Sequence, residues 1–320
     1  MMSASSMHSL VQDYLNERRR LGFDPDRPGS QLLAFARFVD RVGHTGPLTA
    51  EIILAWAQGE AMRATPITWA RRLDVVRPFL KHRALIDPET AVPDGDIFGR
   101  ARRRLTPHIF TDGEIADLLA AARRLPPPAT LRPATYEAFF GLIASTGLRH
   151  SEALHLRCSD LDLAAGHLTV RQTKFRKSRL VPLHATVLEA MNRYLTIRRR
   201  LLPSAPADLV FVSPAGTAIA DRTAHGVFEK LRAGLKWTAR GDHPAPRIHD
   251  LRHSFICRRV MAWHENGANI DNAMLALSTY VGHAKVSDTY WYLTGVPELM
   301  AVAGKRFEEF AANAGEKRHG

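Results

Sequence analysis

The C-terminal part of the sequence places a histidine and a tyrosine where both could serve one reaction. His283 follows Gly282 and stands nine residues before Tyr292, with Thr289 between them as a possible helix start. A phenol is a poor nucleophile near neutral pH, because its ordinary pKa is about 10. If Tyr292 attacks a substrate, the chain must therefore supply positive charge, hydrogen-bond donors and groups that transfer protons.

Such groups occur at three other places along the chain. Arg149 follows Gly147 at a turn between two helices, so its side chain can point into a cleft. Lys174 lies in a basic turn between two strand-like runs. His249 and Arg252 are three residues apart, so on a helix they share a face and can bind one anion. Together these residues could activate Tyr292 toward a phosphate.

Two of these residues also have a purely structural interpretation. Arg149 can form an ion pair with Glu152, which is the favoured interpretation when the pair is taken alone. His249 can cap the backbone at the start of its own helix. Only the complete set, in its order along the chain, favours chemistry over structure.

The ordered set resembles the motifs of the tyrosine recombinase family, which includes phage integrases and Xer-like enzymes. The resemblance covers about residues 105–310 and is specific, because six motif positions occur in family order: Arg149, Lys174, His249, Arg252, Gly282-His283 and Tyr292. It implies a site-specific DNA recombinase that cleaves and rejoins DNA strands without a metal, a cofactor or ATP.

The resemblance also implies a role for each matching position. Arg149, Arg252 and His283 would hold the non-bridging oxygens of the scissile phosphate. His249 would hydrogen-bond the phosphate and help to take the phenolic proton. Lys174 would protonate the departing 5′-oxygen as a general acid. Attack by the tyrosine would leave a 3′-phosphotyrosyl bond and a free 5′-hydroxyl.

The basic turn departs from the family pattern. The family usually has glycine in this turn, and this sequence has Phe175-Arg176 instead. Lys177 therefore competes with Lys174 for the general-acid role, and the motif position favours Lys174.

Two further ring side chains lie close to these residues in the sequence, Tyr290 and His253. Tyr290 is a rival nucleophile, but on a helix it faces about 200° away from Tyr292. The family spacing from His283 selects Tyr292. His253 is expected to point elsewhere, and the family pattern gives it no direct role.

Apolar periodicity and turn residues predict a mainly α fold with a small antiparallel β-sheet. Helices are expected over 7–21, 31–39, a stretch from Thr49, 66–84, 111–124, 133–146 and a stretch from His249, and strands over 167–172 and 179–183. The resemblance implies a core-binding, SAM-like helical bundle in residues 1–88, a linker in 89–108, a mixed α/β catalytic domain in 109–313 and a polar tail in 314–320.

A last helix is expected from Pro297 to Phe310. In the family this region docks onto a neighbouring protomer. A helix packed on its own domain is the alternative.

The balance of charge indicates a polyanionic partner. Lys and Arg exceed Asp and Glu by 44 − 32 = 12, and guanidinium groups suit phosphate contacts. The candidate DNA-binding residues are Arg71, Arg72, Arg77 and Lys81 in the fourth helix, Arg102, Arg103 and Arg104 in the linker, and Arg176 and Lys177 in the turn. A solvated basic surface is the alternative for each of them.

The composition limits other classes of function. Cys158 and Cys257 are too few for a disulfide framework, and the 15 histidines show no paired metal spacing, so no metal and no cofactor are expected. The N-terminus has no secretory pattern, and no apolar run approaches the roughly 18 residues of a membrane span. A cytoplasmic protein fits best. Its expected partner is double-stranded DNA, bound as a homo-tetramer on synapsed sites or together with related recombinases.

Two other functions are alternatives to site-specific recombination. A type IB topoisomerase-like enzyme would keep the chemistry without strand exchange, but the N-terminal bundle and the docking helix favour recombination. A non-catalytic DNA-binding accessory protein would need neither Tyr292 nor Lys174, so the complete set argues against it.

Overall fold

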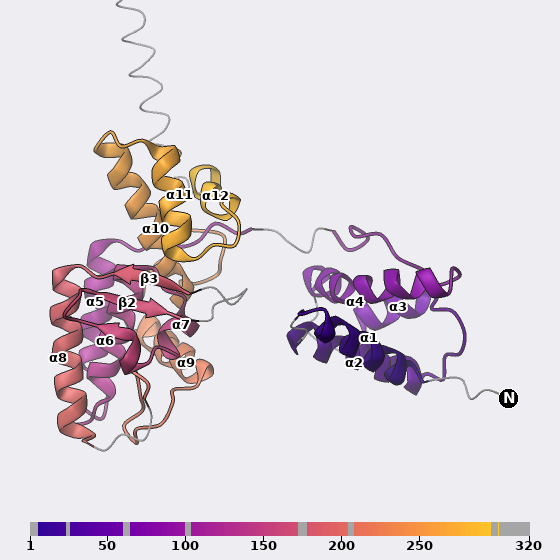
Figure 1. Cartoon of the computed structure of the whole chain (residues 1–320), viewed down its shortest axis with the longest axis horizontal. Coiled ribbons are helices and arrows are strands. Elements are labelled where there is room, and N and C mark those ends of the chain that lie inside the picture. The colour runs from indigo at the N-terminus through magenta and orange to yellow at the C-terminus, as the bar shows by residue number, and fades with distance from the viewer. Residues whose placement is uncertain are drawn as a thin grey trace, which may run out of the picture. The chain divides into compact units, whose positions relative to one another are not determined.

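The computed structural model describes residues 6–23, 26–59, 65–99, 104–171, 178–203, 208–295 and 300. The chain forms two compact units, Met1–Arg104 and Leu105–Gly320, called here unit 1 and unit 2 and described separately. Helices dominate both units, and the strands of the described residues form one small antiparallel sheet in unit 2 (Figure 1). The predicted fold class is confirmed.

Unit 1 is a bundle of four helices, as expected from the sequence. They are α1 (Met7–Arg20), α2 (Asp26–Arg41), α3 (Ala50–Gln58) and α4 (Pro66–Ile86). Their apolar faces meet in a core that includes Phe35, Ile53 and Phe79, each 0% exposed. Burying each such side chain contributes about 1.5–3 kcal/mol, so this core holds the short helices together.

The segment after α4 is part of the same bundle at first. Ala91, Val92 and Phe98 pack against the unit 1 core, and the Ala91 N–H donates to the Leu48 carbonyl at 2.7 Å. The boundary between the compact units falls after Arg104. The first half of the expected linker therefore lies against the helices of unit 1.

Unit 2 contains the other helices: α5 (Asp112–Arg123), α6 (Arg132–Thr146), α7 (His150–Leu154), α8 (Ala185–Leu201), α9 (Asp221–Leu235), α10 (Ile248–Glu265), α11 (Ile270–Val281) and α12 (Ser287–Gly295). The predicted capping box of Thr111 and Glu114 starts α5. Helix α6 is central, since it packs against α5, α8 and α10. Helices α10, α11 and α12 share a smaller core of their own and stand together at one end of unit 2 (Figure 1).

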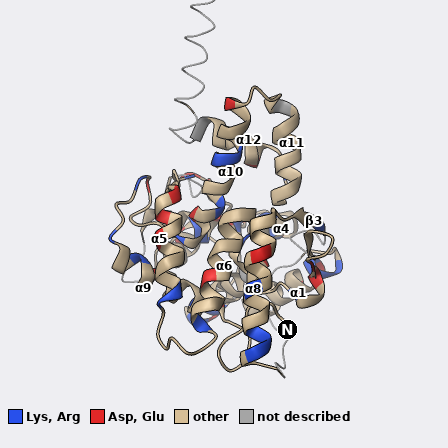
Figure 2. Cartoon of the chain, turned by 90° about the vertical axis from the view of Figure 1, so that its left-hand side faces the viewer, with Lys and Arg blue, Asp and Glu red and all other residues tan. Residues whose placement is uncertain are grey.

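Lys and Arg residues are spread over several helices of unit 2, with α8, α9 and α10 among them (Figure 2). At the end of α8, residues 198–200 place three arginines in the last helical turn. Positive charge is favourable there, because it opposes the negative end of the helix dipole. Part of the basic excess therefore stabilises helices and need not contact a ligand.

The sheet of unit 2 has the order β1-β2-β3, with β1 (Leu161–Asp162), β2 (His167–Val170) and β3 (Arg179–Pro182). The register pairs His167 with Pro182 and Val170 with Arg179. Both predicted strands are confirmed, whereas the two-residue strand β1 was not predicted. The turn between β2 and β3 contains Lys174, Arg176 and Lys177, which lie outside the described residues.

Two glycines end the helices that lead into the candidate site. Gly147 after α6 and Gly282 after α11 have φ angles of 65° and 70°, in the left-handed region that favours glycine. A Cβ on Gly147 would lie 2.5 Å from Cδ1 of Phe255, and a Cβ on Gly282 would lie 2.7 Å from Nη1 of Arg179. Both positions therefore favour glycine for its conformation, and at Gly147 the buried Phe255 ring also leaves no room for a Cβ.

The predicted helix from Pro297 to Phe310 and the tail of residues 314–320 lie outside the described residues, apart from Met300. Of the helices that the structure describes, none combines the length and the apolar character that crossing a bilayer requires.

Candidate active site

Four elements of unit 2 meet at the predicted site. Arg149 precedes α7, and His249 and Arg252 lie on α10. His283 follows the end of α11, and Tyr292 lies on α12. The contacts described below join these five residues into one cluster. The sixth predicted residue, in the turn between β2 and β3, lies outside the described residues.

Arg252 is buried, with 1% of its surface exposed, and joins two helix ends. Its Nη1 donates to the Gly147 carbonyl at 2.7 Å, and its Nη2 donates to the Val281 carbonyl at 2.8 Å. Burial, and then the charge of Arg149, lower the pKa of Arg252 to about 9. The group is still cationic at neutral pH, so the site holds a poorly solvated positive charge that an anion would stabilise.

Arg149 forms the ion pair that its sequence context suggested. Its Nη1 donates to Glu152 at 2.7 Å, and its Nη2 donates to the Gly282 carbonyl at 2.8 Å. Its side chain still has 32% of its surface exposed. The structural and the functional interpretations therefore hold together, because the ion pair orients a guanidinium that solvent, or a ligand, can reach.

Glu152 binds a second arginine that sequence analysis missed. Arg179, the first residue of β3, donates to both Glu152 oxygens at 3.0 and 2.8 Å, and to the Tyr280 carbonyl at 2.7 Å. Burial alone would raise the pKa of Glu152. The hydrogen bond and charge of Arg179, with those of Arg149, outweigh burial and lower this pKa to about 2. A fixed carboxylate thus holds both arginines.

His253 contacts Tyr292, the predicted nucleophile, so the expectation that it points elsewhere was wrong. Its Nδ1 lies 2.5 Å from the Tyr292 hydroxyl oxygen. Burial, and then the charge of His249, hold the pKa of His253 well below its ordinary value. The neutral tautomer with its proton on Nε2 lets the phenol donate to Nδ1. The signal was present in the sequence, because His253 is four residues after His249 and shares its helix face.

His249 is also neutral at physiological pH. Burial, and then the charge of Arg252, lower its pKa to about 3. Its ring meets the His253 ring edge-on, with centroids 4.7 Å apart. Two neutral imidazoles therefore lie in series from the phenol, where they can accept hydrogen bonds or a proton.

Tyr292 is almost fully enclosed, with 3% of its surface exposed. Its ring is parallel to the His283 ring, with centroids 6.4 Å apart and planes 6° apart. His283 is in turn held by a 2.7 Å hydrogen bond between its Nδ1 and Oγ1 of Thr289. The rival Tyr290 packs with the small core shared by α10, α11 and α12.

The cluster is strongly electropositive. Among the residues described above, the Glu152 carboxylate binds Arg149 and Arg179, and its charge also acts on the third guanidinium, that of Arg252. Preorganised donors of this kind stabilise negative charge that develops in a reaction. The arrangement suits a phosphodiester better than a neutral substrate.

Of the predicted DNA-binding residues of unit 1, some are exposed and others form hydrogen bonds within the protein. Arg71 and Lys81 are exposed. Arg72 donates to the Gly59 carbonyl at 2.7 Å, and Arg77 donates to Asp74 at 2.8 Å. Of the linker residues, Arg104 is exposed, and Arg102 and Arg103 lie outside the described residues.

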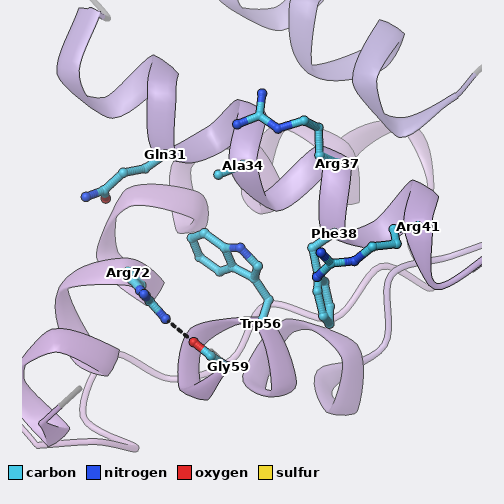
Figure 3. Close-up of a pocket in the computed structure, with 8 residues that line it drawn as sticks. All are labelled: Gln31, Ala34, Arg37, Phe38, Arg41, Trp56, Gly59 and Arg72. Atoms are coloured by element: carbon cyan, nitrogen blue, oxygen red, sulfur yellow. Dashed lines mark hydrogen bonds between the residues drawn. The ribbon is translucent and has the colours of Figure 1, made fainter. Parts of the chain in front are cut away.

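Sequence analysis missed two further arginines in unit 1. Arg37 and Arg41 on α2 line a surface hollow of about 380 Å³ together with Arg72 and the Trp56 ring (Figure 3). An indole face flanked by guanidinium groups can bind an anionic or aromatic partner.

The sequence matches the model of the phage integrase family over residues 109–296. It is 39% identical to the putative integrase/recombinase y4rB of Sinorhizobium fredii, over 95% of this chain and 98% of that protein. It is 31% identical to the tyrosine recombinase XerD of Caulobacter vibrioides, over 82% of this chain and 83% of that protein. The chain belongs to the phage integrase family.

Membership in this family of tyrosine recombinases confirms the resemblance found in the sequence. It makes the chain an enzyme of site-specific DNA strand breakage and rejoining, and it does not favour the topoisomerase-like or accessory alternatives.

Two solved structures share the fold. The Tn1549 transposon integrase in complex with a circular intermediate DNA has a TM-score of 0.63 at 16% identity, over 90% of this chain and 94% of that one. The XerH recombinase in a post-cleavage complex has a TM-score of 0.60 at 18% identity, over 89% and 80%. Both resemble this recombinase in its arrangement of elements.

Replacing Glu152 by Gln should remove an acid-sensitive part of the stability. The carboxyl pKa is about 2 when folded against an ordinary 4.5, so its contribution is complete above about pH 4.5 and is lost as the pH falls toward 2. The shift corresponds to about 3 kcal/mol. We expect Glu152→Gln to unfold at lower urea concentration at pH 7, and its difference from the wild type to shrink between about pH 5 and pH 2.

Asp117→Asn on α5 is the matched control. The Asp117 side chain is exposed, so this change should alter the free energy of unfolding by less than about 0.5 kcal/mol. A difference between wild type and Glu152→Gln that does not vary with pH would show that the Glu152 charge is not the stabilising feature.

Proposed function

We propose that this recombinase cleaves DNA by attack of Tyr292 on a scissile phosphodiester held by Arg149, Arg252 and His283. The observation that supports it best is the contact of the Tyr292 hydroxyl with neutral His253, within 2.5 Å, beside buried cationic Arg252. The phenol thus has a hydrogen-bond acceptor in His253 and a cation near it that can bind a phosphate.

The reaction follows from this arrangement. The Tyr292 oxygen forms a bond to phosphorus while the bond from phosphorus to the 5′-oxygen breaks. The phenolic proton passes toward His253 and His249, and the departing 5′-oxygen takes a proton from Lys174. One phosphoester replaces another, so the 5′-hydroxyl of a second strand can reverse the step and complete the exchange without ATP.

The fold supports a general acid in the turn between β2 and β3. The register pairs Val170 with Arg179 at the end of the hairpin that leads into this turn. Arg179 is bound to Glu152, which also binds Arg149. The strand that follows the turn therefore begins with a residue bound to the same carboxylate as Arg149, which supports the assignment of the general acid to this turn.

The nucleophile can be identified with nicked suicide substrates made from the DNA that flanks the gene. We expect the wild type and Tyr290→Phe to form a covalent protein–DNA adduct, and Tyr292→Phe to form none. The adduct is measured by denaturing electrophoresis. Loss of the adduct in Tyr290→Phe alone would contradict the assignment of Tyr292, and tight binding without any adduct would favour a non-catalytic role.

The same substrates test the two histidines. His253→Ala and His249→Ala should each slow adduct formation by about 10²–10⁴-fold, the usual contribution of a positioned proton acceptor. His155→Ala, an exposed histidine at the end of α7, should leave the rate unchanged. A normal rate in His253→Ala would exclude a role for its contact with the phenol.

Sulfur substitution distinguishes Lys174 from Lys177. In a substrate with sulfur in place of the bridging 5′-oxygen, the leaving group needs no proton, because a thiol is far more acidic than an alcohol. We expect Lys174→Ala to slow cleavage of the oxygen substrate by about 10²–10⁴-fold and to cleave the sulfur substrate at nearly the wild-type rate. Lys177→Ala, which removes an assigned DNA contact, should affect cleavage of both substrates to the same extent. The reverse pattern would assign the general acid to Lys177.

We further propose that unit 1, as the core-binding domain of residues 1–88, binds duplex DNA together with the catalytic domain of residues 109–313. The residues assigned to this contact are basic: Arg71, Arg72, Arg77 and Lys81, with Arg102, Arg103 and Arg104 of the linker and Arg176 and Lys177 of the turn. The arginines around Trp56 extend this set (Figure 3). Such binding weakens steeply with salt and would take place in the cytoplasm.

Strand exchange requires two duplexes, so we propose that four copies assemble on paired sites, alone or with related recombinases. An apolar hollow of about 330 Å³ on unit 2 supports this, since Phe255, Trp263, Leu277 and Tyr280 line it. The region from Pro297 to Phe310 of a neighbouring copy, amphipathic in sequence, would occupy it.

Truncation tests this assembly. A chain ending at Met300, and Trp263→Ala in the full chain, should still form the covalent adduct on one site but fail to give a complex of four copies and two duplexes in light scattering. Leu275→Ala, an exposed leucine on α11 outside the hollow, is the matched control. Normal assembly of the truncated chain would show that this region packs on its own domain.

A further inference from the structure

A second cluster of side chains lies beside the candidate active site. His150, Asp221 and His225 place one ligand atom each within 4.8 Å of one another. Nε2 of His150 lies 2.8 Å from Oδ1 of Asp221, and Nε2 of His225 lies 3.8 Å from Oδ2 of the same carboxylate. None of the three residues has a role in the proposed strand cleavage.

The fold assembles this cluster from two helices. Asp221 and His225 are four residues apart on α9, so they share a helix face. His150 is the first residue of α7. The two imidazole rings meet edge-on, with centroids 4.9 Å apart. Sequence spacing does not reveal this group, because His150 is distant from Asp221 and His225 in the chain and approaches them only through tertiary packing.

Two imidazole nitrogens and one carboxylate oxygen form a common ligand set for zinc, which often binds three protein ligands and a water. Mg²⁺ and Ca²⁺ prefer oxygen ligands and suit this set poorly. The side chains of Asp221 and His225 are 57% and 40% exposed. They can therefore rotate to the separation of roughly 3.3 Å that ligand atoms about 2.0–2.1 Å from zinc require.

We propose that His150, Asp221 and His225 bind a divalent transition-metal ion of the zinc type, which bridges α7 and α9. The proposal is independent of the assigned roles in DNA cleavage. Nδ1 of His150 is buried without a hydrogen-bond partner. Ligating histidines usually donate this second N–H to an outer group, and loss of that partner weakens binding about 10–100-fold. We therefore expect micromolar rather than nanomolar affinity.

A metal ion bound at this position would affect the neighbouring candidate active site. His150 follows Arg149 directly in the chain, and a positive charge on His150 lowers the pKa of His249. An ion on His150 would tie the start of α7 to α9 and add positive charge beside Arg149. Metal binding would then stabilise the fold and strengthen the attraction for a phosphate.

Cobalt(II) is a suitable probe, because tetrahedral coordination gives it intense visible absorption. In the full-length chain without an affinity tag, we expect about one strongly absorbing Co²⁺ per chain, displaced by Zn²⁺. His225→Ala and Asp221→Asn should each weaken binding at least about tenfold. His155→Ala should bind like the wild type. Thermal unfolding in chelator should show that all three variants fold.

Thermal unfolding with and without Zn²⁺ gives a second readout, since a ligand of the folded state raises the midpoint. The wild type and His155→Ala should gain stability, and the two cluster variants should not. Unchanged Co²⁺ affinity in His225→Ala and Asp221→Asn, or only octahedral, weakly absorbing Co²⁺, would overturn the proposal and leave a contact between His150 and Asp221 without a metal.

Discussion

The structure of unit 2 depends on a buried guanidinium that joins two helix ends. Arg252 donates to the last carbonyls of α6 and α11, at Gly147 and Val281. Carbonyl groups at a helix C-terminus lack partners within the helix and form the negative end of its dipole. The same bonds therefore complete two helices and hold a positive charge in the protein interior. Removing the guanidinium would leave both carbonyls without these hydrogen bonds.

This arrangement resolves a conflict between stability and function. An anion-binding site needs cations with little solvent, and such cations are costly to bury alone. Carbonyl oxygens accept a hydrogen bond from each of the three arginines Arg252, Arg149 and Arg179, while Glu152 supplies the compensating carboxylate to the last two. Carbonyls are weaker partners than carboxylates, so positive potential remains for a phosphate. The fold thus holds the three guanidinium groups in place without neutralising their positive charge.

Local sequence signals predicted most of the fold. Glycine at position 147, the capping box at Thr111 and the alternation in 179–183 each act through nearby backbone, so a pattern in the chain reveals them. Long-range contacts were harder to predict. Arg179 reaches Glu152 only because β3 packs beside α7, and no local pattern encodes that approach. The proximity of His253 to the phenol depends on how α12 packs on α10, and sequence spacing gave only its helix face.

The burial of Tyr292 also affects the lifetime that a covalent protein–DNA intermediate would have. With 3% of this residue exposed, bulk water has little access to the phenolic oxygen. A phosphotyrosyl ester formed there would be sheltered from hydrolysis, which would turn a reversible exchange into a permanent strand break. With Tyr292 as the proposed nucleophile, this packing would favour a DNA hydroxyl over water as the group that releases the enzyme.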